Sequence, residues 1–454
     1  MRAYQFKKAL LPAGWAEDVR IEVGDDGLIA RVSPDGAPKG AERIAGIALP
    51  GMPNLHCHAF QKGMAGLAER RGPTGDSFWT WREVMYRFLS QLTPDDVEAI
   101  AAYAYMEMLE AGFTTVGEFH YLHHDPAGQP YADIGEMATR IAAASDATGI
   151  GLTLLPSLYT YGGFRGAAPN PGQIRFINST DRFVTLMERS REIVSKRPGA
   201  TIGIAPHSLR AVSPEQLREV AAIFATGPVH IHAAEQTKEV DDCVASLGAR
   251  PVQWLLDEMG ISERWCLIHA THMTHDETMR LAQSGAVAGL CPLTECSLGD
   301  GIFNGETYLA AQGRFGIGTD SNIQIDAPAE LRQLEYSQRL KARARNVMTT
   351  REGESTGRSL YARALAGGAQ ALGQPIGALA PGHRADIVVL DADHPDLAGA
   401  SGDMVLDVLV FSAGRGLIRT VMTCGKPVVH DGRHVAREVI AQKYRSTVSR
   451  LADG

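Results

Sequence analysis

The sequence predicts an α/β protein, with a (β/α)8 TIM-type barrel and a small β-sandwich domain built from both termini. Three observations support this fold class. Short apolar runs alternate with helical stretches through the middle of the chain, a pattern typical of βα units. Eight such runs occur over about 300 residues, which suits one barrel. Stretches with strand-like alternation lie near both ends, and we expect them to pair with each other.

The predicted barrel strands all end in polar residues. In chain order they are IALPGMPNLHCH, FTTVGEFHY, GLTLLPSLY, ATIGIAPHS, GPVHIHAAE, WCLIHATHM, GAVAGLCP and RFGIGTD. Helical patterns lie between them, such as DDVEAIAAYAYMEMLEAG, which stops at a glycine. A doubly wound open sheet is the alternative, but no GxGxxG follows the first strand.

The two ends of the chain have a different pattern from the middle. Near the N-terminus, AEDVRIEVGDDGLIARVSP alternates apolar and polar residues around turns, and ADIVVLDAD and LIRTVMTCGKPVVHDGR do so near the C-terminus. The predicted domains are therefore 1–48, the N-terminal part of the small β domain; 49–375, the barrel; and 376–454, the rest of the β domain with a terminal helix.

Composition excludes several classes of protein. Of the 454 residues, 44% are hydrophobic and 21% charged, as in soluble globular proteins. The net charge of -8 disfavours a nucleic-acid surface. No apolar run reaches the roughly 18 residues of a membrane span, and the N-terminal residues lack a signal-peptide pattern. Six cysteines without a CxxC pair favour reduced thiols. We expect a cytoplasmic protein with no nucleic-acid or membrane partner.

The first barrel strand ends in a His-Cys-His motif. Side chains alternate along a strand, so His56 and His58 point to one face and Cys57 to the other. Two imidazoles on one face can hold one ion at roughly 2.0–2.1 Å. An isolated HxH can also be accidental, but its position at a predicted strand end favours a metal site.

The fifth strand adds a histidine and an acid. His230 and His232 share a face, and we favour His232 as a ligand because it is nearer the strand end. His230 is then expected to be a hydrogen-bonded core residue. Glu235 follows three residues later, and an acid beside an activated water suits proton transfer. The alternative for Glu235 is a solvated loop carboxylate.

The sixth and eighth strands end in His269 and Asp320. Buried histidines are often only structural. A carboxylate after a buried strand must be paired, neutralised or bound to metal, although Asp320 could also cap the next helix. His272 and His275 are interpreted as loop residues. Together, these strand ends place histidines and one aspartate around a common centre.

The same pattern bears on the number and kind of metal ions. Two ions about 3.5–4 Å apart need a bridging anionic ligand, but GLTLLPSLYT and ATIGIAPHSL contain no lysine or carboxylate. We therefore expect one divalent ion. Three histidines and a carboxylate favour Zn²⁺, while iron and manganese stay open.

This combination of motifs resembles the amidohydrolase superfamily over nearly the whole chain, and within it the mononuclear deaminases. The resemblance implies that His56, His58, His232 and Asp320 bind zinc. It also implies that Glu235 and His269 move protons. Asp320, at the metal, is expected to accept the proton of the attacking water.

Longer segments resemble the N-formimino-L-glutamate deiminase family. These segments are GEFHYLHHDPAGQPY, LLPSLYTYGGF, APHSLRAV and GTDSNIQIDAPAELRQLEYSQRLKARARN. The resemblance implies hydrolysis of N-formimino-L-glutamate to N-formyl-L-glutamate and ammonia in histidine degradation, and it suggests a homodimer. It further implies that the substrate contacts five residues, which are Gln61, Arg82, Tyr121, His207 and Arg210.

A substrate with two carboxylates needs cations in its pocket. Arg82 and Arg210 are candidates, because arginine binds a carboxylate through two parallel hydrogen bonds. Arg87, Arg165 and Arg175 are rivals. Another deaminase, acting on a nucleobase or an adenosine derivative, is the nearest alternative function. A zinc-containing barrel that binds without catalysis is the alternative from another class, but structural zinc sites often use cysteines.

Overall fold

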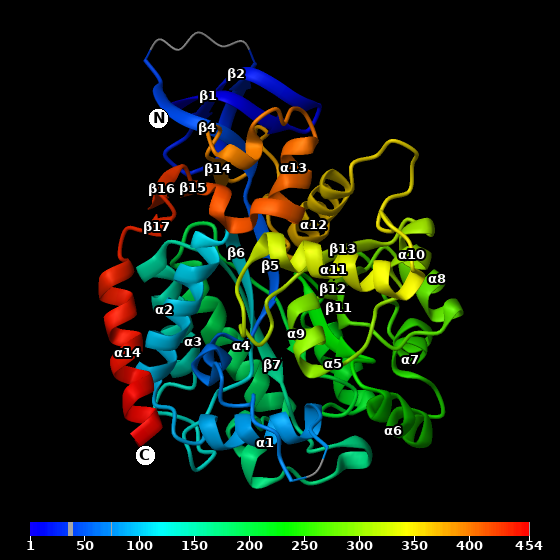
Figure 1. The fold of residues 1–454 in the computed structure, drawn as a ribbon. Coiled ribbons are helices and arrows are strands. Elements are labelled where there is room, and N and C mark those ends of the chain that lie inside the picture. The colour runs from blue at the N-terminus through cyan, green and yellow to red at the C-terminus, as the bar shows by residue number, and fades with distance from the viewer. Residues whose placement is uncertain (35–39, 74, 454) are drawn as a thin grey trace.

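The computed structural model describes residues 1–34, 40–73 and 75–453. Parallel strands form a barrel at its centre (Figure 1). They are β5 (Met52–Cys57), β6 (Phe113–His120), β7 (Gly151–Leu158), β8 (Thr201–Ile202) with β9 (Ala205–Pro206), β10 (Val229–Ala233), β11 (Trp265–His269), β12 (Val287–Leu290) and β13 (Arg314–Ile317). Each lies within one of the predicted strand segments, so the expected TIM-type barrel is confirmed.

The first predicted strand is divided in two. Its beginning belongs to β4 (Glu42–Pro50), which pairs with strands of the small β domain, and β5 starts only at Met52. Gly51 lies between them, with its backbone against the Thr114 side chain, where a Cβ atom would not fit. Glycine therefore permits the close approach at which the chain passes from one sheet to the other.

The fourth predicted strand is also interrupted. β8 and β9 are two residues each, and Gly203 between them lies against the carbonyl of Pro228. The chain stays in the barrel because Gly203 N donates to Leu154 O, 3.0 Å away, and His230 N donates to Ile204 O, 3.0 Å away.

Strands from the two ends of the chain form one mixed sheet, in the order β17-β16-β15-β14-β4-β1-β2-β3. Their bounds are β1 (Arg2–Leu11), β2 (Gly14–Val23), β3 (Ile29–Ser33), β14 (Ile387–Leu390), β15 (Ile418–Thr423), β16 (Lys426–His430) and β17 (Arg433–His434). In the described part of this sheet, β1 and β4 pair in parallel and the other neighbouring strands pair antiparallel. The sheet has a buried apolar cluster of its own, which includes Phe6 and Ile387. The expected union of both termini is confirmed, whereas the domain boundaries at 48 and 375 stay predictions.

Helices surround the barrel. Those before the sixth barrel strand are α1 (Phe78–Leu89), α2 (Pro94–Glu110), α3 (Glu136–Thr148), α4 (Thr180–Ser195), α5 (Pro214–Ile223), α6 (Thr237–Leu247) and α7 (Pro251–Glu258). The later ones are α8 (His275–Gln283), α9 (Pro292–Leu298), α10 (Gly305–Ala310), α11 (Ala327–Ala342), α12 (Thr356–Leu372) and α14 (Arg437–Asp453). The short helix α13 (Met404–Val408) lies beside the small β domain instead (Figure 1).

The start of α2 shows how sequence sets a helix end. The Thr93 side chain accepts from Asp96 N at 3.3 Å, and the Asp96 carboxylate accepts from Thr93 N at 2.9 Å. This reciprocal pair, with Pro94 in the first turn, satisfies backbone donors that a helix start leaves free.

The C-terminal helix α14 lies along α2, on the barrel (Figure 1). Tyr444 of α14 stacks on Tyr103 of α2 with ring centroids 4.0 Å apart, and Arg450 forms an ion pair with Asp96. From the sequence we predicted this helix as part of the 376–454 segment of the small β domain. The position of a helix in the chain does not show which element it packs against.

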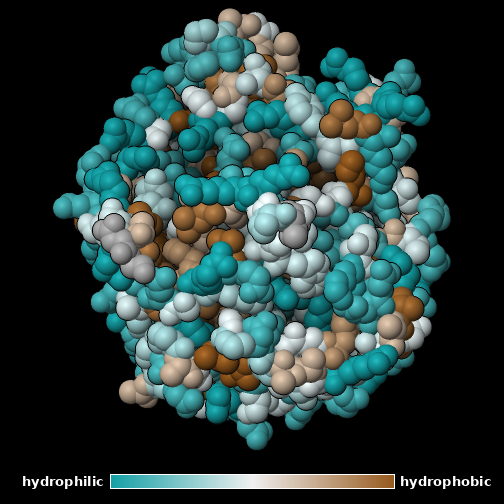
Figure 2. Space-filling model, turned by 60° about the horizontal axis from the view of Figure 1, so that its bottom comes forward, coloured by the Kyte–Doolittle hydropathy of each residue, from teal (hydrophilic) through white to brown (hydrophobic). Residues whose placement is uncertain are grey.

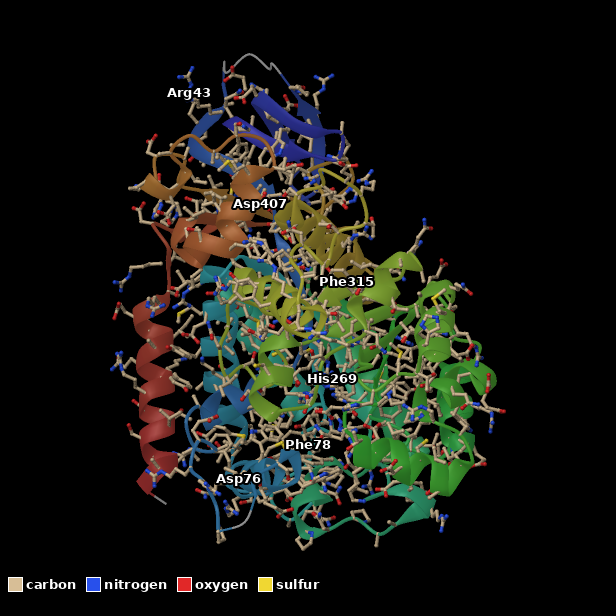
Figure 3. The ribbon with its side chains drawn as sticks, turned by 45° about the vertical axis from the view of Figure 1, so that its right-hand side comes forward. Arg43, Asp76, Phe78, His269, Phe315 and Asp407 are labelled. Atoms are coloured by element: carbon tan, nitrogen blue, oxygen red, sulfur yellow. The ribbon has the colours of Figure 1, made fainter. Side chains whose placement is uncertain are left out.

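The barrel mouth lies at the end of the molecule away from the small β domain. Figure 3 shows Phe78 and His269 in the barrel half and Arg43 in the small domain. Viewed from the barrel end, the surface is mostly hydrophilic, with scattered hydrophobic groups (Figure 2). All six cysteines are free thiols. Among the described residues, no helix is long and apolar enough to cross a membrane.

Candidate active site

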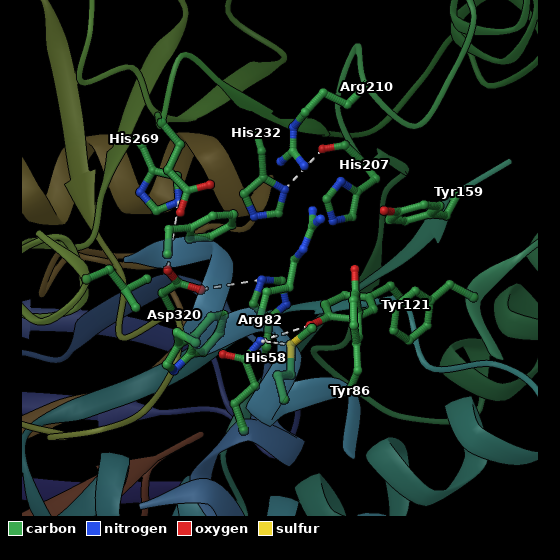
Figure 4. Close-up of a pocket in the computed structure, with 17 residues that line it drawn as sticks. His58, Arg82, Tyr86, Tyr121, Tyr159, His207, Arg210, His232, His269 and Asp320 are labelled. Atoms are coloured by element: carbon green, nitrogen blue, oxygen red, sulfur yellow. Dashed lines mark hydrogen bonds and ion pairs between the residues drawn. The ribbon is translucent and has the colours of Figure 1, made fainter. Parts of the chain in front are cut away.

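Three imidazoles and a carboxylate meet at the carboxyl ends of the barrel strands; Figure 4 shows His58, His232 and Asp320 of this group. His56 Nε2 lies 3.2 Å from His232 Nε2 and 3.4 Å from Asp320 Oδ1. His58 Nε2 lies 3.4 Å from the same aspartate oxygen. All four residues are buried. The four residues expected as ligands are thus brought together from strands that are far apart in sequence.

These distances suit a tetrahedral ion. Bonds of roughly 2.0–2.1 Å to a central zinc place neighbouring ligand atoms roughly 3.3–3.4 Å apart. The histidine atoms of His56, His58 and His232 are close enough together to share one ion. The residues therefore fit the metal that their chemistry implies.

Hydrogen bonds fix the orientation of two of the histidines. His58 Nδ1 donates to Phe119 O at 2.9 Å, and His232 Nδ1 donates to His207 O at 3.0 Å. In neutral imidazoles this leaves a bare Nε2 on each ring. The lone pair of His58 Nε2 then faces the Asp320 carboxylate, an arrangement that a cation between them would relieve.

Burial keeps the histidines of this group neutral. It lowers the pKa of His56 to about 3 and also lowers the pKa of His58 and His232. Burial alone would raise the pKa of Asp320, but the hydrogen bond with His56 and the nearby histidines outweigh it and lower that pKa. Neutral imidazoles and an ionised carboxylate are the forms that bind metal.

The backbone at two strand ends is in the left-handed region. His269 has φ 68° and Asp320 has φ 44°. Non-glycine residues in such conformations cost on the order of 1–3 kcal/mol, and they cluster at functional sites. Here the turn in the backbone directs both side chains into the barrel mouth (Figure 4).

Glu235 and His269 lie beside the ligand group. His269 Nε2 is 3.7 Å from Glu235 Oε1 and 3.8 Å from Asp320 Oδ2. Burial would lower the pKa of His269, but the carboxylates of Glu235, Glu295 and Asp320 outweigh it and raise that pKa. Burial also raises the pKa of Glu235, against the opposing charges of His269 and Arg210. The pair can therefore hold and exchange protons next to the proposed metal.

Glu295 is a buried neighbour that sequence reasoning missed. Its Oε1 lies 3.2 Å from His269 Nδ1 and accepts from Cys291 N at 2.8 Å. Glu295 follows the seventh strand, in the segment CPLTEC. A carboxylate that follows a buried apolar run was the feature that could have identified it as a site residue. Glu295 holds one ring nitrogen of His269 and so turns the other towards Glu235 and Asp320.

The two proposed substrate arginines line the same pocket as three of the proposed ligands, His58, His232 and Asp320. Arg82 lies over the Trp79 ring at 4.7 Å and over the Tyr86 ring at 5.6 Å. The Nε atoms of Arg82 and Arg210 are buried, and neither has a hydrogen-bond partner among the residues that the structure describes. Within the described part of the chain, neither guanidinium forms a salt bridge, so both can bind an incoming anion.

The rival arginines lie elsewhere. Arg87 and Arg165 are exposed, and Arg165 donates to Ala245 O. Arg175 is buried, and its guanidinium donates to the carbonyls of His124, Leu89 and Leu92. Of the five arginines considered from sequence, only Arg82 and Arg210 line this pocket.

The three remaining substrate candidates also line the pocket. Gln61 Nε2 donates to the Tyr121 hydroxyl at 2.8 Å. The His207 ring lies 4.5 Å from the Tyr159 ring and 4.8 Å from the His232 ring, between centroids. The sequence did not predict the aromatic residues of the pocket wall, since single aromatics in helices and loops carry no specific pattern. Besides Tyr159, these wall residues are Phe78, Trp81, Tyr86 and Phe176.

Two alternatives that the sequence left open now have a structural answer. His230 is a core residue, whose Nε2 donates to Ala371 O at 2.8 Å. The cap of the helix after Asp320 is Asp326, which accepts from Ala329 N at 2.9 Å. Asp320 is therefore free of the capping role. His272 lies in a loop and donates to Asp300 O, whereas His275 begins α8.

Comparison with known proteins agrees with this geometry. Residues 47–428 match the family described as "Amidohydrolase family". Residues 1–46 match the family described as "Formimidoylglutamate deiminase HutF, N-terminal domain". The chain belongs to the amidohydrolase family. This amidohydrolase is 51% identical to the formimidoylglutamate deiminase of Pseudomonas aeruginosa over 457 residues, which cover 100% of both chains.

Solved structures resemble this amidohydrolase along its whole length. A crystal structure of an amidohydrolase from Brucella melitensis is 51% identical, with a TM-score of 0.95 and 100% of each chain covered. An adenosine deaminase from Xanthomonas campestris with bound zinc has a TM-score of 0.82 at 21% identity, covering 100% of this chain and 98% of that one. The latter likeness shows the fold alone. The expected amidohydrolase enzyme and its barrel are confirmed.

Proposed function

We propose that this amidohydrolase hydrolyses N-formimino-L-glutamate to N-formyl-L-glutamate and ammonia, a step of histidine degradation. The observation that carries the proposal is a pair of arginines, Arg82 and Arg210, which form no salt bridge among the described residues and line the same pocket as His58, His232 and Asp320. The 51% identity to a formimidoylglutamate deiminase over the full length supports the same reaction.

The cofactor in this proposal is one divalent ion, zinc, held by His56, His58, His232 and Asp320. Their nitrogen and oxygen atoms, 3.2–3.4 Å apart where the pairs are in contact, support this ligand set. Histidine with one carboxylate is a donor set that suits zinc. When bound, such an ion supplies the Lewis acidity that makes water nucleophilic near neutral pH.

Arg82 and Arg210 bind the two substrate carboxylates in this mechanism. Arginine matches a carboxylate with two parallel N–H donors, and the aromatic rings beside Arg82 hold its guanidinium plane. Gln61, Tyr121 and His207 add hydrogen-bonding groups around the substrate. The formimino group is thereby directed towards Glu235 and Asp320.

The chemistry follows from the positions of three side chains. Water adds to the formimino carbon, and Asp320 accepts the proton that this water loses. Glu235 protonates the imino nitrogen, which gives a tetrahedral carbon that bears a hydroxyl and an amino group. The proton held by Asp320 then passes through His269 to the amino nitrogen, while the hydroxyl returns its proton to Glu235. The bond from carbon to that nitrogen breaks, ammonia leaves, and both carboxyl groups regain their starting protonation. His269, which lies between the two carboxylates, orients the water and shares the proton. The remaining formyl group keeps the oxygen that came from water.

An ammonia-release assay tests the proposal. Zinc-loaded enzyme should release ammonia from N-formimino-L-glutamate, and a chelated sample should not. A panel of guanine, cytosine and adenosine derivatives tests the main alternative, since such flat substrates do not use two arginines. Ammonia from the panel but none from N-formimino-L-glutamate would replace the proposed substrate, and no ammonia from either would favour a binding protein.

The enzyme acts on a small dicarboxylate in the cytoplasm, without a nucleic-acid or membrane partner, and it forms a homodimer. The acidic net charge of -8 supports the absence of nucleic acid. Light scattering and cell fractionation measure the oligomeric state and the location.

A further inference from the structure

The proposed metal site lies across the line where the barrel closes. β5 carries His56, His58 follows directly after its last residue, and Asp320 follows β13. No regular hydrogen-bonded ladder joins these two strands in the described part of the chain. Instead, Cys57 and Asp320 form an isolated bridge. The separation between ligands on the two strands is therefore not set by continuous strand pairing.

A few backbone hydrogen bonds cross this line. His56 O accepts from Thr319 N at 3.1 Å and from Asp320 N at 3.0 Å, and His58 N donates to Asp320 O at 3.0 Å. Gly318 packs so closely against His56 that a Cβ atom there would lie 2.7 Å from His56 O. The two ligand-bearing segments thus touch backbone to backbone.

Three buried polar side chains span the same line. The Asn54 amide on β5 donates to Thr319 Oγ1 at 2.7 Å and accepts from Thr319 N at 3.1 Å. Thr319 Oγ1 then donates to Asn322 Oδ1 at 2.7 Å. The exposed fractions of Asn54, Thr319 and Asn322 are 0%, 1% and 0%. Water does not compete with these bonds, so the cluster holds a single geometry.

Asn322 connects the three polar side chains to two of the proposed metal ligands. Its Nδ2 lies 3.0 Å from His58 O and 3.0 Å from Asp320 O, as a donor to both carbonyls. One amide thereby bonds the backbone of a ligand from each strand. Asp320 and Asn322 both have positive φ, 44° and 57°, and such conformations persist when surrounding contacts hold them.

We infer that Asn54, Thr319 and Asn322 form a positioning cluster that fixes His58 and Asp320 across the closure of the barrel and thereby sets the affinity of the metal site. The inference rests on the proposed ligand set. Partners that orient metal ligands typically change metal affinity about 10- to 100-fold when removed. None of the three side chains is itself a proposed ligand.

The experiment measures zinc affinity by competition with a chelator, together with the melting temperature with and without zinc. Thr319→Val keeps the shape of the side chain and removes the hydroxyl. Asn322→Gly keeps the freedom to adopt positive φ and removes the amide. We expect both variants to bind zinc about 10- to 100-fold more weakly, and Thr319→Ser, which keeps the hydroxyl, to restore nearly all of the affinity.

A matched control separates positioning from general stability. Thr153→Val removes another buried hydroxyl, near the start of β7, which donates to Leu372 O at 3.0 Å. This variant should lose melting temperature but keep the wild-type zinc affinity. If the cluster were purely structural, Thr319→Val and Asn322→Gly would likewise lower the melting temperature without changing the zinc affinity. Wild-type zinc affinity in those two variants therefore overturns the inference.

The remaining outcomes are also decisive. If Thr319→Val and Asn322→Gly fail to fold while Thr153→Val folds, the cluster serves barrel closure and the inference is overturned. His56→Ala tests the ligand set separately. If that variant keeps zinc, the proposed metal site is wrong. If it loses zinc while the cluster variants keep it, only the positioning role is wrong.

Discussion

Glu235 Oε1 lies 3.7 Å from His269 Nε2, and both side chains are buried at the mouth of the barrel. The two residues belong to neighbouring, paired strands. Glu235 lies just after the end of β10, and His269 is the last residue of β11. Their separation allows a proton to pass between them through a substrate atom or a water.

Glu235→Gln should reduce kcat about 10²- to 10⁴-fold, because the amide cannot donate a proton to the leaving nitrogen. Zinc content should not change, since Glu235 is not in the proposed ligand set. Ammonia release and metal analysis measure the two effects. Glu219→Gln, at an exposed position of α5, is the control. Near-normal turnover of Glu235→Gln would reject the acid–base role.

His56→Ala should lose zinc and, with it, ammonia release. The matched control is His230→Ala, which removes a buried barrel histidine that bonds Ala371 O instead. That variant should be less stable but should still hold zinc. Metal content after dialysis against metal-free buffer distinguishes the two. Equal zinc loss in both variants would mean that the assay reports stability and not ligation.

Arg210→Ala should lower kcat/KM for N-formimino-L-glutamate about 10- to 100-fold, mainly through KM. The lost charge-assisted hydrogen bonds are worth roughly 1.5–3 kcal/mol. Arg87→Ala, which changes an exposed arginine of α1, should behave like the wild type. Steady-state kinetics measure the difference. An equal loss with a neutral amidine substrate would contradict binding of a carboxylate.

The contribution of the buried histidines to the stability of the chain should decrease as the pH falls below about 6.5. Burial lowers the pKa of His120 to about 3 and that of His230 to about 4. Between the histidine pKa of the unfolded chain and these lower pKa values of the folded chain, the two histidines bind protons in the unfolded chain but not in the folded one. Their contribution to the free energy of unfolding therefore decreases as the pH falls. Urea denaturation across this range measures the slope. His230→Gln should make it shallower, and an unchanged slope would remove His230 from the explanation.

Arg384→Ala should lower the free energy of unfolding by about 3–5 kcal/mol, because it leaves a buried carboxylate without its partner. Arg384 Nε donates to Asp386 at 2.8 Å, and Nη1 donates to Gln374 Oε1 at 2.7 Å. Arg218→Ala, which breaks an exposed pair with Glu258, should cost less than about 1 kcal/mol. Urea denaturation compares the two, and similar losses would contradict the role of burial.

Much of the fold was visible as local pattern. The eight barrel strands were predicted because each is a short apolar run that ends in polar residues, and every one contains an observed strand. The partner of α14 was not visible. The stacking of Tyr444 on Tyr103 joins residues that are far apart in the sequence, and no local pattern encodes such a contact.

The sequence by itself determined which residues stand at the strand ends, and therefore that His56, His58, His232 and Asp320 face one mouth. It did so because strand alternation and barrel topology follow from local hydrophobic patterns. The tertiary structure alone decided which arginines reach the pocket and which buried groups hold the ligands. Glu295, Thr319 and Asn322 act through side-chain contacts across strands, and these depend on packing in three dimensions that residue spacing does not specify.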